Sequence, residues 1–89
     1  MTRLVIPADV ACASVEDGAV VLHMGTKRYY SLNETGAAIW RLIEESVAIE
    51  EIPARLSASY DVALDEARRE VEALVSALEE TTLLMVDRA

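Results

Sequence analysis

The sequence has very little cysteine, histidine and glycine, and these shortages exclude several kinds of site. Its 89 residues include one cysteine, Cys12, one histidine, His23, three glycines and no phenylalanine. A single cysteine cannot close a disulfide within the chain, and with one histidine it provides no set of metal ligands. The glycines are isolated, so neither the GxGxxG nor the GxxxxGK phosphate-binding motif is present. The sequence therefore predicts no metal ion and no cofactor, and the lone thiol favours the reducing cytoplasm.

Basic residues are also scarce, since eight Lys and Arg stand against sixteen Asp and Glu and leave a net charge of -8. Such a field repels phosphate backbones and anionic lipid headgroups. No stretch approaches the roughly 20 apolar residues of a membrane span, and Pro7 and Asp9 interrupt the N-terminal region before a signal-peptide core forms. We therefore expect neither nucleic-acid binding, nor secretion, nor membrane insertion.

What the chain does have is apolar residues, at 53% of the total. A chain of this length supports one modest core, so residues 1–89 are expected to form a single domain. Three strands are expected first, at Val10 to Val15, Ala19 to Met24 and Lys27 to Leu32. The turn signals between them are Asp17-Gly18 and Gly25, which favour hairpins through positive φ. The meander order makes the third strand an edge strand.

Side-chain alternation along these strands predicts which face is buried. Val20, Leu22 and Met24 share one face of the middle strand, and Tyr30 and Leu32 share one face of the third. These two sets are expected to face the core.

Helical spacing replaces strand alternation after Leu32. The first helix is expected from an Asn33 cap to Glu45, the second from about Glu50 to Ser59, and the third from an Asp65 cap to about Glu80. The segment Leu83 to Val86 is an apolar tail that adds a turn or a strand. Three antiparallel strands followed by three helices predict a winged-helix-like α+β fold.

The candidate catalytic groups have no partners in the sequence. His23 lies mid-strand, and no serine or cysteine is spaced to pair with it. Cys12 is expected to be a small strand residue rather than a reactive thiol. The carboxylates alternate with the apolar stripes of the helices, as in a solvated face. The sequence predicts a protein that is not an enzyme.

The expected edge strand is the most informative segment, because Lys27 to Leu32 holds two adjacent tyrosines and two cations. An open edge can accept an extended peptide, with main-chain hydrogen bonds for affinity and nearby pockets for specificity. The alternative is an edge protected by Lys27 and Arg28, with the tyrosines half-buried. Composition alone favours neither interpretation.

The segment Lys27 to Trp40 reads KRYYSLNETGAAIW, which closely resembles the signature of the PqqD-like family. In that family a strand ending in Leu-Asn leads directly into a helix that carries small residues and then Ile-Trp. The resemblance extends over nearly the whole chain. It departs at Thr82, where the family usually has glycine, and at Ala48, where it usually has a Ser or Thr cap.

The resemblance implies a recognition element for ribosomally made, post-translationally modified peptides, which binds the leader segment of a precursor peptide and has no catalysis of its own. In such domains the leader lies antiparallel to the third strand, in a cleft closed by the third helix. The residues that the resemblance assigns to this site are Lys27, Arg28, Tyr29, Tyr30, Ser31 and Leu32 on the strand, and Glu66, Ala67, Glu70, Val71 and Leu74 on the helix.

The stand-alone length and the Arg-Tyr-Tyr-x-Leu-Asn motif are most similar to the form of the family found in lasso-peptide biosynthesis. The partners implied there are a transglutaminase-like cysteine leader peptidase and an asparagine-synthetase-like cyclase. A form serving pyrroloquinoline quinone synthesis, with a radical SAM enzyme as partner, is the nearest alternative.

Two other classes of function are weighed against leader binding. A winged-helix DNA-binding protein is disfavoured because the third helix carries six carboxylates against Arg68 and Arg69. A purely structural subunit, which binds an enzyme and no peptide, stays open at this point.

Overall fold

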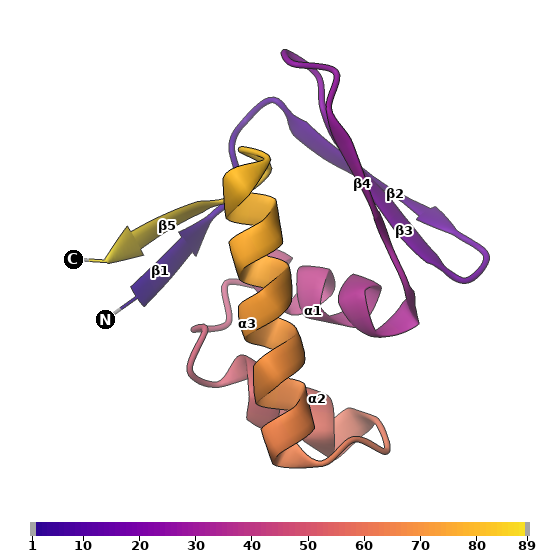
Figure 1. Cartoon of the computed structure of the whole chain (residues 1–89), viewed down its shortest axis with the longest axis vertical. Helices are drawn as coiled ribbons and strands as arrows, with labels where there is room; N and C mark the ends of the chain where they lie inside the picture. Colours follow the sequence, from indigo (N-terminus) through magenta and orange to yellow (C-terminus); the bar gives the residue numbers. More distant parts are fainter. Residues whose placement is uncertain (1, 89) are drawn as a thin grey trace.

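The computed structural model describes residues 2–88 and contains two small sheets and three helices (Figure 1). In chain order the elements are β1 (Thr2–Val5), β2 (Val10–Val15), β3 (Gly18–His23), β4 (Tyr29–Leu32), α1 (Glu34–Glu44), α2 (Ile52–Ser59), α3 (Leu64–Glu80) and β5 (Met85–Arg88). The antiparallel sheet has the order β2-β3-β4, so the expected meander, its edge strand and the three helices after it are confirmed. In Figure 1, α3 runs between this sheet and the β1–β5 ribbon.

Only the C-terminal strand of the β1–β5 ribbon was anticipated from the sequence. β1 was not predicted, whereas the tail after α3 was expected to form a turn or a strand. The two strands pair antiparallel, with Leu4 opposite Val86 and Val5 opposite Met85, and they bring the two ends of the chain together. Because each strand is four residues long and its partner lies at the other end of the chain, no local pattern reveals the pairing.

The expectation that Val20, Leu22 and Met24 face the core was wrong. Val21 is fully buried, whereas Met24 is 51% exposed. The strand register explains the reversal, because Val21 lies opposite Tyr30, and opposed residues of antiparallel strands share a face. Because Tyr30 and Leu32 face the core, the residues opposite them on β3, Val21 and Ala19, face it as well.

The β2–β3 turn is formed by Glu16 and Asp17, one position earlier than expected, since Val15 pairs with Gly18. Gly18 is required by close packing: a Cβ there would lie 1.9 Å from the carbonyl oxygen of Leu32. No other residue fits without separating β3 from β4.

The β3–β4 turn differs from the expectation that Gly25 supplies the positive φ. Lys27 does so instead, with φ 64. The Nδ1 atom of His23 accepts hydrogen bonds from the backbone N–H groups of Gly25 and Thr26, each at 3.1 Å. This imidazole closes the turn, and β4 begins at Tyr29 rather than Lys27.

The α1 cap is as predicted, because the Oδ1 of Asn33 accepts from the N–H of Gly36 at 2.8 Å. The expected Asp65 cap of α3 was wrong. The capping position is Ala63, without a side-chain hydrogen bond, and Asp65 lies in the first turn. The chain enters α3 early because Val62 packs against the core and its carbonyl accepts from the Ser57 hydroxyl at 2.8 Å.

Replacing Asn33 with alanine is expected to lower the free energy of unfolding by about 1 kcal/mol, because the Gly36 amide loses its acceptor. Urea denaturation followed by circular dichroism measures the change. Asn33→Asp is the matched control, since it retains a side-chain oxygen at the cap. Equal losses in the two variants would show that the cap is not what stabilises α1.

The core joins the sheet to all three helices. Its fully buried large side chains are Trp40, Ile39, Ile52, Leu56, Leu78, Leu83, Leu84, Val21 and Val71. This packing holds α3 at a fixed position beside β4. Across residues 2–88, no helix combines the length and the apolar character that crossing a bilayer demands.

Candidate functional site

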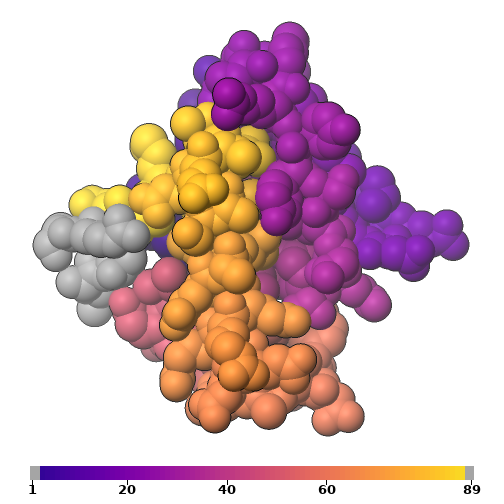
Figure 2. All heavy atoms as spheres, in the orientation of Figure 1, coloured from indigo at the N-terminus to yellow at the C-terminus, as the bar shows by residue number. Residues whose placement is uncertain are grey.

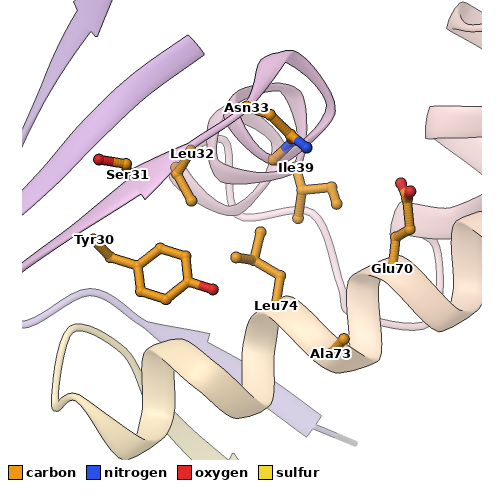
Figure 3. Close-up of a pocket in the computed structure, with 9 residues that line it drawn as sticks. Tyr30, Ser31, Leu32, Asn33, Ile39, Glu70, Ala73 and Leu74 are labelled. Carbon is orange, nitrogen blue, oxygen red and sulfur yellow. The ribbon is translucent and has the colours of Figure 1, made fainter.

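A groove of about 260 Å³ separates the edge strand β4 from α3 (Figure 3). Its lining residues are Tyr30, Ser31, Leu32, Asn33, Gly36, Ile39, Glu70, Ala73 and Leu74. In the space-filling view of Figure 2, the orange atoms of α3 and the magenta atoms of the β4 region meet on the face turned to the viewer. The groove therefore lies on this face of the molecule, along the β4 edge of the sheet.

The backbone of β4 presents hydrogen-bonding groups to this groove. The backbone N–H of His23 donates to the carbonyl of Arg28 at 2.8 Å, so the Arg28 carbonyl points toward β3. Successive residues of a strand direct their backbone groups to opposite sides. By the register of β3 and β4, Tyr30 and Leu32 therefore direct their backbone groups toward β3, whereas Tyr29 and Ser31 direct theirs to the open edge.

Apolar and polar groups line the groove in about equal measure, and its apolar side chains are gathered on one wall. Figure 3 shows the Tyr30 ring and Leu74 pointing toward one another, with Leu32 and Ile39 above them in this view. Leu32 and Ile39 are buried, at 5% and 1% exposure. This combination of an open strand edge and a groove with an apolar wall suits an extended peptide that carries large side chains.

One polar atom in the groove lacks a hydrogen-bond partner. The Oε2 atom of Glu70 is buried, and within the described chain it accepts no hydrogen bond. Leaving a buried acceptor unpaired costs about 1–3 kcal/mol. Glu70 is thus a group that a ligand with a hydrogen-bond donor would satisfy.

The strand residues assigned to the site by resemblance fall into two groups. Tyr30, Ser31 and Leu32 line the groove. Lys27 and Arg28 are exposed residues ahead of β4. Tyr29 belongs to β4, but its side chain lies on the opposite face of the strand from Tyr30 and is 67% exposed.

The helix residues divide in the same way. Glu70 and Leu74 line the groove. Ala67 and Val71 are buried in the core beneath it, at 0% and 1% exposure. Glu66 is exposed and does not line the groove.

Four lining residues were not assigned from the sequence: Asn33, Gly36, Ile39 and Ala73. The first three belong to the Asn33 cap and α1, which follows β4 without a loop and so closes one end of the groove. The sequence feature that could have predicted their place in the groove is the direct connection from the strand to the helix. Ala73 lies three residues after Glu70, one helical turn along the same face.

Cys12 and the acidic residues do not form a second chemical site. Partial burial raises the pKa of the Cys12 thiol, Glu44 raises it further, and Arg41 opposes them. A thiol with a raised pKa stays protonated near neutral pH and is a poor nucleophile. Between residues 2 and 88, no three His, Cys, Asp or Glu side chains are grouped as a metal ion would need.

Comparison with known families bears on the whole of this groove. Residues 18–84 match the family described as Coenzyme PQQ synthesis protein D (PqqD). The chain belongs to the PqqD family. The matched range runs from the first residue of β3 through α3, so the resemblance seen in the β4–α1 segment is confirmed.

Solved structures similar to this PqqD-family chain include two complexes. TbiB1 in complex with the TbiA(beta) leader peptide is 34% identical, with a TM-score of 0.80 over 89% of this chain and 92% of that chain. Lasso peptide synthetase B1 complexed with the leader peptide has a TM-score of 0.81 at 24% identity, over 92% of this chain and 96% of that chain. The second likeness shows the fold. No curated protein matches the chain.

Proposed function

We propose that this PqqD-family domain binds the leader segment of a ribosomally synthesised precursor peptide in lasso-peptide biosynthesis. The leader adds as a strand to β4 and places side chains in the groove against α3. The observation that carries this function is the open edge of β4 beside a groove that Tyr30, Leu32 and Leu74 help to line. Its support is the 34% identity to TbiB1, which was solved with a leader peptide.

The domain acts as a non-catalytic carrier in the cytoplasm. It presents the bound leader to a transglutaminase-like cysteine leader peptidase and to an asparagine-synthetase-like cyclase. Because strand addition uses one edge of the sheet, most of the domain surface stays available to these enzymes while the leader is bound.

A second candidate is suggested by the description of the matched family, Coenzyme PQQ synthesis protein D. In that case the same groove holds the precursor of pyrroloquinoline quinone, and the partner is a radical SAM enzyme. The net charge of -8 speaks against the DNA-binding alternative.

Fluorescence polarisation with labelled peptides tests the proposal and separates the candidates. The probes are the TbiA(beta) leader, leaders of short precursor genes neighbouring this one, and the quinone precursor peptide. Submicromolar binding that is restricted to lasso-type leaders supports the proposed function. Preference for the quinone precursor would favour the second candidate, and indifference to every peptide would leave a structural subunit.

Tyr30→Ala is expected to weaken leader binding by about 1–2 kcal/mol, because it removes an aromatic wall of the groove. Tyr29→Ala is the matched control, since Tyr29 is the adjacent tyrosine on the other face. It is expected to leave affinity nearly unchanged. Equal losses in both variants would move the binding surface away from the groove.

A further inference from the structure

Glu70 is the charged residue among those that line the groove, and nothing there neutralises it. The groove is otherwise lined by neutral side chains, and no basic residue of the described chain is among them. On α3, Arg68 lies 3.8 Å from Asp65 in an exposed ion pair. The Oε2 atom of Glu70 has no partner within residues 2–88.

Groups of the described chain that could donate to this oxygen do not bond to it. Asn33 lines the same groove, but its Oδ1 accepts from the Gly36 amide at 2.8 Å, and no donor of residues 2–88 bonds to Glu70 Oε2. The backbone N–H groups of α3 around Glu70 are committed to the helix. A donor that satisfies this oxygen therefore comes from solvent or from a ligand.

The apolar lining lies beside this carboxylate. Glu70 and Leu74 are four residues apart on α3, which places them about 6 Å apart along the axis on the same face. In Figure 3 the Glu70 carboxylate rises from α3 on the side away from Tyr30, while Leu74 faces Tyr30 and Ile39. The groove thus changes from apolar to acidic over the length of one long side chain.

We infer that Glu70 selects the leader: the peptide side chain seated between Tyr30 and Leu74 has an apolar body and a hydrogen-bond donor at its tip. Lysine, arginine and tyrosine have this chemistry, and aspartate and glutamate are rejected. The inference rests on the proposed function, because it concerns the same groove. Its physical basis is that a carboxylate with a buried, unpartnered oxygen favours a donor beside it and repels a second carboxylate.

A matrix of domain variants and peptide variants tests this selection. The domain is used as wild type, Glu70→Gln and Glu70→Ala. The peptide is the leader that binds best, with each donor-bearing side chain trimmed singly: Tyr→Phe, Lys→norleucine, Arg→norleucine, Thr→Val and Ser→Ala. Affinities come from fluorescence polarisation at two salt concentrations.

One trimmed peptide is expected to bind the wild-type domain about tenfold more weakly than the intact leader does. The same peptide and the intact leader are expected to bind Glu70→Ala with affinities that agree within about twofold. Loss of this coupling at high salt or in Glu70→Gln identifies a cationic tip, whereas a coupling retained in both identifies a hydroxyl. A peptide with glutamate introduced at the same position is expected not to bind the wild-type domain. Its binding is expected to be restored in Glu70→Ala.

Glu66→Gln is the matched control, because Glu66 lies on the same helix, is exposed and does not line the groove. It is expected to show no coupling with any peptide variant. Tight leader binding in which no trimmed side chain couples to Glu70 would overturn the inference and leave the proposed function standing. Failure of wild type to bind any leader would overturn both.

Discussion

Replacing Ser31 with proline is expected to weaken leader binding at least tenfold while the domain remains folded. The N–H of Ser31 points to the open edge of β4, where an added strand would use it. Proline removes that donor and places its ring in the path of the incoming strand. A lost hydrogen bond that leaves its partner unpaired costs about 1–3 kcal/mol, and about 1.4 kcal/mol is a tenfold change in affinity.

The fold should tolerate this change, because proline is accepted on an edge strand when the missing N–H faces away from the sheet. Ser31→Ala is the control, since it removes the hydroxyl and keeps the backbone donor. Fluorescence polarisation gives the affinities, and circular dichroism verifies folding. If Ser31→Pro is folded and binds like wild type, the leader does not pair with β4.

Replacing Trp40 with alanine is expected to lower the free energy of unfolding by about 3–5 kcal/mol. Trp40 is 2% exposed and lies at the centre of the core on α1. Its removal leaves a cavity that neighbouring side chains fill only in part. For a domain of this size, such a loss is a large share of the total stability.

Trp40→Phe separates packing from hydrogen bonding at this position. The indole Nε1 is buried and has no partner in the described part of the chain. Phenylalanine retains most of the aromatic volume and removes an unpaired donor, so its cost is expected to be well below that of alanine. Urea denaturation measures both variants. Equal losses would mean that the Nε1–H makes a bond on which the core depends.

The two Trp40 variants change the core that positions the groove and leave the groove's own lining residues unchanged. The groove exists because the core holds α3 at a fixed position beside β4, and because β4 passes into α1 at Asn33 without a loop. A binding domain built in this way needs no catalytic group, only an open strand edge and a pocket with selective lining.

Much of this arrangement follows from local sequence patterns. The alternation and turn residues before Leu32 predicted three strands, and their order made β4 an edge. The Asn33 cap and the apolar spacing after it predicted α1 nearly to its last residue. These features depend on residues within one or two turns of each other, so the sequence alone determines them.

The tertiary structure decided what depends on contacts between distant segments. The buried face of β3 was set by its register with β4, which put Val21 opposite Tyr30. The β1–β5 ribbon required the two ends of the chain to pair. On α3, Ala67 and Val71 turn into the core while Glu70 and Leu74 line the groove, a division set by where the helix packs. Local propensity cannot fix these choices, because their free energy comes from burial against partners that are remote in the chain.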